Sequence, residues 1–94
     1  MSVLKKVAAT GDVAAAGAGG NPRQLYSAIL SPAAAVATLD VRDSSGGTVL
    51  ATLQAAANGA AVVWQAGDRD GVSFASSIHA TLTGAGASAS FEYD

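Results

Sequence analysis

Apolar and polar side chains alternate along most of this sequence, and turn-forming residues interrupt the alternation about every ten residues. A period of two places successive side chains on opposite faces of a β-strand. Short strands separated by regularly spaced turns are typical of antiparallel sandwiches and barrels. The pattern therefore predicts an all-β antiparallel sandwich, jelly-roll or immunoglobulin-like, with seven to eight short strands and almost no helix.

The expected strands share this alternation and are bounded by Gly, Pro, Ser, Asn or Asp. They span residues 25–30, 35–42, 48–55, 61–66, 72–74, 78–83 and 87–93, with a further short strand at 3–9. Asn58–Gly59 predicts a two-residue hairpin turn, because both residues accept a positive φ. Gly84–Gly86 predicts another hairpin turn, leading into the last strand. Residues 50–57 contain good helix formers, but the neighbouring β-branched residues and flanking glycines favour a strand.

The segment from Thr10 to Asn21 consists mainly of Gly, Ala and other small residues. Three alanines between glycines cannot nucleate a helix, and a Gly-rich sequence is typical of linkers. We therefore expect residues 1–21 to form an N-terminal strand and a flexible Ala/Gly-rich arm. Residues 22–94 are expected to form the β-sandwich domain.

The core of such a domain is expected to be marginal. Of the 94 residues, 23 are alanines and 24 are larger apolar residues. Ordering a chain costs on the order of 1.5 kcal/mol per residue. Burial of an alanine-rich core of this size is therefore expected to offset this cost only barely, which leaves a net free energy of folding near zero. The strand faces predict a core that includes Tyr26, Leu39, Val41, Leu53, Val62, Trp64, Phe74, Leu82 and Phe91. An exposed aromatic platform for sugar is the alternative role of its Tyr, Trp and Phe side chains.

Composition also excludes several classes of function. The chain has no cysteine, which rules out thiolate chemistry, cysteine zinc sites and iron–sulfur clusters. A net charge of −2 and a single histidine do not provide the positive charge that a nucleic-acid site requires. No apolar run reaches the roughly 18–20 residues of a membrane span, and no signal peptide is recognisable. We expect no cofactor, no metal, no nucleic acid and no membrane.

Three short motifs resemble chemical sites but fit turns or strand faces better. Asp68–Gly71 has the opening of a calcium loop, but His79 stands where the loop needs Glu, so a polar turn is expected. Gly84–Ala89 matches a dinucleotide fingerprint, which requires a helix that cannot follow here. His79 alternates with apolar neighbours, so we expect it on the solvent face of a strand, without a catalytic partner.

The remaining charged residues give no catalytic constellation. Asp40 and Asp43 lie at a strand end and a turn, where Asp is ordinarily found. Lys5 and Lys6 form the only run of positive charge. They are either solvated lysines or a contact to an acidic protein surface. No catalytic residue and no enzyme activity are predicted.

The text from Tyr26 to Tyr93 resembles small structural proteins of tailed-phage virions. The resemblance rests on five stretches, residues 25–29, 37–43, 47–50, 71–74 and 78–84, and covers about 70 of the 94 residues. It implies a cysteine-free β-sandwich of the capsid decoration (cement) type or a tail-associated protein, located in the virion and assembled in the bacterial cytoplasm. It carries no catalytic residue across.

The expected function is therefore structural. The resemblance implies a subunit that binds the outer surface of the major capsid protein lattice and stabilises the shell, with Lys5 and Lys6 as capsid contacts. It also favours a homotrimer, since decoration proteins gather at three-fold positions. The expected sheet edges have no evident feature that would prevent pairing with other chains, so we expect neighbouring subunits to cover them. The alternative is a tail- or fibre-associated binding module that recognises a host glycan.

Overall fold

The computed structural model describes residues 3–15, 17, 19, 21–67 and 71–94. No α-helix occurs in this part of the chain, and the all-β prediction is confirmed. The strands are β1 (Val3–Val7), β2 (Gly11–Ala14), β3 (Arg23–Ser31), β4 (Ala37–Asp43), β5 (Val49–Ala55), β6 (Val62–Gln65), β7 (Val72–Phe74), β8 (Ile78–Thr83) and β9 (Ser88–Tyr93).

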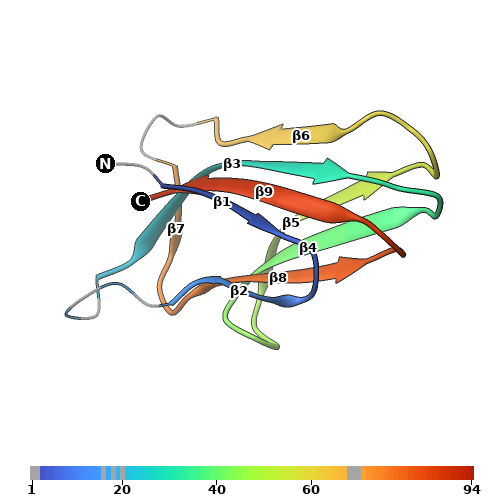
Figure 1. The fold of residues 1–94 in the computed structure, drawn as a ribbon. Helices are drawn as coiled ribbons and strands as arrows, with labels where there is room; N and C mark the ends of the chain where they lie inside the picture. The colour runs from blue at the N-terminus through green and yellow to red at the C-terminus, as the bar shows by residue number, and fades with distance from the viewer. Residues whose placement is uncertain (1–2, 16, 18, 20, 68–70) are drawn as a thin grey trace.

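Two antiparallel sheets pack face to face (Figure 1). One sheet has the order β1-β9-β3-β6, with β7 pairing to the first half of β3, and the other has the order β2-β8-β4-β5. Consecutive strands mostly change sheet, so that β1 and β2, β9 and β8, β3 and β4, and β6 and β5 occupy matching positions. This is the strand order of a jelly roll. An immunoglobulin fold would instead keep its first two strands in one sheet.

Among the described residues, β4 and β5 are the only consecutive strands that pair with each other. The turns at Asn58–Gly59 and Gly84–Gly86 carry the chain from one sheet to the other, so both hairpin predictions are wrong. Asn58 does adopt a positive φ of 56°, and its N–H donates to the Ala33 carbonyl at 2.7 Å. The residues form a turn as predicted, but a turn motif does not determine which strands pair.

Inward-facing side chains from both sheets form one core. Its buried members are Val13, Ala14, Leu25, Ala28, Leu30, Ala37, Leu39, Val41, Leu53, Ala55, Phe74, Ile78, Ala80, Ala87, Ala89 and Phe91. Five of the predicted core residues are in this set, and Val62, Trp64 and Leu82 are partly buried against it. The frequent alanines make the core compact rather than large.

Tyr26 is not part of this core, because a β-bulge shifts the alternation of β3. The register against β9 slips between Leu25 and Ser27. Leu25 is consequently fully buried, together with Ala28 and Leu30, whereas Tyr26 is only partly buried. A single extra residue in a strand reverses the facing of everything before it. The sequence pattern, which predicts Tyr26 in the core, is wrong at this point.

The expected linker also contains a strand. Gly11–Ala14 forms β2, the edge of the four-stranded sheet, and pairs with β8. A bulge between Asp12 and Ala14 turns both Val13 and Ala14 inward, and Val13 is 1% exposed. Residues 3–14 therefore belong to the sandwich rather than to an arm lying outside it.

Candidate functional site

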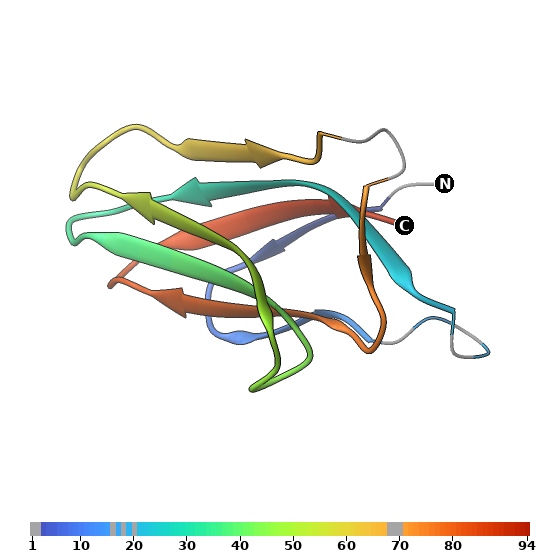
Figure 2. The same ribbon diagram turned by 180° about the vertical axis from the view of Figure 1, so that it is seen from behind.

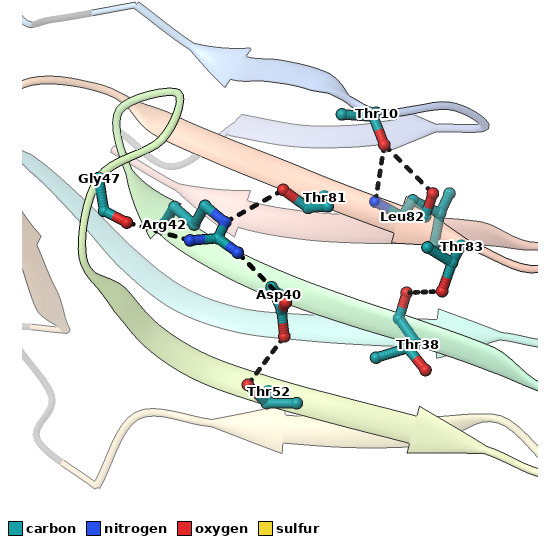
Figure 3. A network of polar contacts seen from close by, with 9 residues as sticks. All are labelled: Thr10, Thr38, Asp40, Arg42, Gly47, Thr52, Thr81, Leu82 and Thr83. Atoms are coloured by element: carbon teal, nitrogen blue, oxygen red, sulfur yellow. Dashed lines mark hydrogen bonds and ion pairs between the residues drawn. The ribbon is translucent and has the colours of Figure 1, made fainter.

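The outer face of the β2-β8-β4-β5 sheet carries a network of polar side-chain contacts. We call this surface the polar face. Its members are Thr10, Asp12, Thr38, Asp40, Arg42, Thr52, His79, Thr81 and Thr83. They come from all four strands or the residue before β2, because alternate residues of neighbouring strands share one face. Figure 3 shows these residues except Asp12 and His79.

Arg42 is the centre of the polar face. Its Nε donates to Thr81 Oγ1 at 3.2 Å, and its Nη1 donates to the Gly47 carbonyl at 3.1 Å. Its Nη2 lies 3.5 Å from Asp40 Oδ2. All three guanidinium nitrogens thus have partners within the protein, and the side chain links β4 to β8 and to the turn before β5.

Asp40 is held in the same way. Its Oδ1 accepts a hydrogen bond of 2.9 Å from the Thr52 hydroxyl of β5, and its Oδ2 faces Arg42. At the other end of the sheet, the Thr10 hydroxyl both donates to and accepts from the backbone of Leu82. These contacts brace neighbouring strands against one another. A carboxylate that is engaged on both oxygens is poorly placed for acid–base chemistry.

His79 lies on this outer face, as its position in the alternation predicts, but it is covered rather than exposed. Its side chain is 10% exposed, whereas that of Asp12 is 58% exposed. His79 Nδ1 lies 2.9 Å from Asp12 Oδ1. Because an ionised carboxylate only accepts hydrogen bonds, Nδ1 carries the hydrogen. The pair resembles two members of a catalytic triad, but no described Ser or Thr hydroxyl is hydrogen-bonded to the ring. It joins β2 to β8.

Asp43, at the end of β4, accepts three backbone hydrogen bonds from the loop between β7 and β8. The donors are Ser76, Ser77 and Ala75, at 2.8, 3.3 and 3.2 Å. The N–H of Ser76, followed by those of Ser77 and Ala75, holds the pKa of the carboxyl below its ordinary value. Asp43 therefore fixes a loop rather than pairing with Asp40 in a reaction.

Lys5 and Lys6 point to opposite sides of β1 and do not form a joint patch. Lys5 reaches across to the other sheet, where its Nζ donates to the Val13 carbonyl at 3.1 Å. Lys6 is aligned with Ser90 on β9 and faces outward, away from the core. Of the two predicted capsid contacts, Lys5 has its ammonium group hydrogen-bonded within the chain, and Lys6 lies on the outward side of β1.

The aromatic side chains do not gather into a platform. Trp64 lies opposite Ala28 on the inner face of its sheet, and both Trp64 and Tyr93 pack against the core. The Arg23 guanidinium lies over the Tyr93 ring, 5.8 Å from its centroid. A hollow of about 340 Å³ is lined by Val36, Gln54, Ala55 and Ala56, none of which offers a ring for a sugar to stack on.

The two lateral sides of the sandwich differ in charge. One side is formed by the edges β1 and β2, which carry Lys5, Lys6 and Asp12. The other is formed by the edges β5 and β6, and no charged residue occurs anywhere from Ser44 to Gly67. We call it the uncharged side. It lies along the β5 and β6 ribbons in Figure 2.

Large apolar side chains are exposed on and beside the uncharged side. Val49 and Leu50 of β5 are 39% and 42% exposed, and Val63 of β6 is 56% exposed beside its cross-strand partner Ile29. Natural proteins usually protect a free sheet edge with charge, proline or a covering segment. Charge and proline are both missing from β5 and β6, so this side has the chemistry of an interface.

The remaining candidates for a metal site or a membrane span add no functional site among the described residues. Asp68, Arg69 and Asp70 of the predicted polar turn lie outside the described residues. In the part of the chain that is described, no three His, Asp or Glu side chains lie close enough to hold a metal ion. No helix of that part is long and apolar enough to span a membrane. Comparison with protein families, curated proteins and solved structures found no match.

Sequence reasoning missed the uncharged side, although the signal is present. The absence of Asp, Glu, Lys and Arg over residues 44–67 is visible in the printed sequence. Its meaning depends on the topology, since the two strands in this stretch are the edge strands of different sheets on the same side. The pairing of Asp12 with His79 is equally hidden, because the sequence predicts a linker where β2 forms.

Proposed function

We propose that the protein is a structural subunit of a tailed-phage virion. It binds the outer surface of the capsid as a decoration protein and stabilises the shell by burying surface between subunits. The sequence resemblance supports this role, and so does the jelly-roll order, which is common in viral shells. A fold alone does not establish a function, because jelly rolls also occur in lectins and cupins.

The observation that carries the proposal is the contrast between the polar face and the uncharged side. On the polar face, Arg42 and Asp40 are engaged with other residues of the chain and His79 is covered. On the uncharged side, no strand of the described residues pairs with the outer edges of β5 and β6, and Val49, Leu50 and Val63 are exposed. Such a molecule is suited to recognising proteins rather than to transforming a substrate.

Lys6 supports a second, electrostatic contact with the shell. It stands on the charged side of the sandwich and points outward, so it can approach a carboxylate of the capsid lattice. An exposed ion pair weakens as salt concentration rises. Attachment through Lys6 should therefore be salt-dependent, whereas contacts of the uncharged side should not be.

The glycan-binding alternative has less support. It requires exposed aromatic rings near polar groups, and Trp64 and Tyr93 instead pack against the core. Tyr26 is partly exposed, but no second ring accompanies it on the same strand.

Cosedimentation tests the proposal. Virions are purified from the phage or lysogen that carries the coding sequence, separated into capsids and tails, and incubated with tagged protein. The proposal predicts pelleting with capsids, weakened by salt and by Lys6→Gln. Lys5→Gln is the matched control, since it removes the same charge from an ammonium that is bound to Val13. Binding to tails alone, or to neither fraction, would contradict the capsid role.

A further inference from the structure

We infer that the uncharged side binds a second copy of this chain, with β5 of one copy pairing antiparallel to β5 of the other. The pairing would join two four-stranded sheets into one continuous eight-stranded sheet across a two-fold axis near Thr52. The inference deepens the structural role proposed above and rests on it for the use of this assembly, but its geometry comes from the edge strands alone.

Among the four sheet edges, β5 is the one suited to pairing. β1 carries two lysines, and one of them is tied to Val13 across the gap between the sheets. β2 and β6 have only four residues each, and β2 is bulged beside Asp12. β5 has seven residues, with no charge and no proline. Its outer edge has no partner strand in the described structure.

The sequence of β5 is compatible with itself in the antiparallel direction. An axis at Thr52 places Ala51 opposite Leu53 of the copy, and Leu50 opposite Gln54. Directly opposed residues share a face of the sheet, and Ala51 and Leu53 both face inward in each subunit. No like charges meet in this register or in the one shifted by two residues. Thr52 faces outward, where its hydroxyl is bound to Asp40.

The start of β5 shows what a second copy would cover. Val41 pairs with Ala51 and Arg42 pairs with Val49, so Leu50 is an extra residue without a register partner on β4. This bulge leaves two consecutive large apolar side chains exposed. A bulge twists a sheet edge and ordinarily discourages pairing, but this one lies at the start of β5 and leaves Ala51–Ala55 in regular register with β4. Here it presents Leu50, which association would remove from water.

Charge also favours a two-fold arrangement over a ring. In a three-fold ring, each copy offers two different surfaces to its neighbours. The opposite side of this sandwich carries Lys5, Lys6 and Asp12, which would be desolvated against uncharged residues. A two-fold axis lets the uncharged side meet itself. We therefore infer a dimer rather than the trimer that the resemblance implies.

The molecule is large enough for such an interface. Its extents are 41 × 25 × 19 Å, and the long extent follows the strands (Figures 1 and 2). Stable protein interfaces bury roughly 800 Å² on each partner. One side of a body of this length and thickness offers an area of that order.

Matched lysine variants test the interface. Leu50→Lys places a charge on the β5 edge, and Leu4→Lys makes the same substitution at a more exposed position on β1. Sedimentation velocity should show a dimer for the wild type and for Leu4→Lys, and a monomer for Leu50→Lys. Far-ultraviolet circular dichroism of each variant verifies that the strands are retained. A wild-type monomer or trimer, or a dimer that survives Leu50→Lys, would overturn the inference.

Single-cysteine crosslinking gives an independent measurement, because the chain has no cysteine of its own. Thr52→Cys should be joined to its copy by a short bis-maleimide, since the two positions lie beside the axis. Lys6→Cys is the control on the charged side and should remain uncrosslinked at the same protein concentration. Equal crosslinking of the two variants would also overturn the inference. The capsid cosedimentation above is scored separately: a dimer that binds no capsid retains this inference and removes the proposed function.

Discussion

Lys5 on β1 donates a hydrogen bond of 3.1 Å to the carbonyl of Val13 on β2, and so ties together the two sheets at one side of the sandwich. The matching edges on the other side, β5 and β6, contain no charged residue. A lysine at an edge also discourages pairing with other chains. The protein thus protects one side of its sandwich and leaves the other available.

The first prediction concerns residues 1–14. Deleting them removes β1, β2 and the buried Val13, so we expect a protein without a cooperative unfolding transition. Urea denaturation followed by tryptophan fluorescence measures this. A truncated chain with the wild-type midpoint would show that this segment is not part of the core.

The second prediction concerns two of the aromatic residues that contribute to the core, Phe91 and Trp64. Phe91→Ala should lower the free energy of unfolding by about 3–5 kcal/mol, the usual range for a buried aromatic, because Phe91 is 1% exposed. Trp64→Ala should cost less, since Trp64 lies on the edge strand β6 and keeps part of its surface in water. Urea titrations of both variants, followed by circular dichroism, show which substitution lowers the free energy of unfolding more. A larger loss for Trp64 would contradict this placement of the core.

The third prediction concerns Gly71, which precedes β7. Its φ is +78°, and a Cβ there would lie 2.8 Å from the Leu25 carbonyl oxygen and 3.0 Å from the Tyr26 ring. Gly71→Ala should therefore destabilise the protein by about 1–3 kcal/mol. Gly67→Ala is the matched control, because a Cβ at Gly67 meets nothing within 4 Å. Thermal unfolding compares the two, and equal melting temperatures would refute the close approach of Gly71 to β3.

The fourth prediction concerns acid. Backbone hydrogen bonds, chiefly from Ser76, lower the folded-state pKa of Asp43 below its ordinary value of 3.8. The carboxylate therefore contributes stability above pH 3.8, and this contribution is lost as pH falls through the lower folded-state pKa. Asp43→Asn should reduce stability near neutral pH and lessen the further loss below pH 3.8. The urea midpoint of unfolding is measured at several pH values for both proteins. The prediction would be contradicted if, below pH 3.8, the midpoint fell equally steeply in the wild type and in Asp43→Asn.

The strands themselves could be predicted from the sequence because a half-buried strand imposes its own alternation. Residues 78–83 and 72–74 were located to the residue. The predicted orientation of side chains is wrong at Tyr26, because a bulge adds one residue to β3 and shifts its alternation. β2 was missed because a four-residue strand of Gly, Asp, Val and Ala has too few large side chains to alternate.

Pairing and function could not be predicted in the same way. The turn at Asn58–Gly59 is local, but whether it folds a strand back on its neighbour or carries it to the other sheet depends on the whole core. His79 was correctly placed on an outer face, yet its burial and its contact with Asp12 arise from a strand 67 residues away. The charge-free stretch gains its meaning only when β5 and β6 are known to be edges.

Amide hydrogen exchange of β5 tests the central claim, which is that this protein functions through a covered, uncharged edge. Exchange is followed by mass spectrometry for the wild type and for Leu50→Lys at the same protein concentration. We predict that peptides spanning Val49–Ala55 exchange slowly in the wild type and quickly in the variant, with peptides from β1 unchanged. Rapid exchange of β5 in both proteins would contradict the account, because it would show that the edge is left open to water.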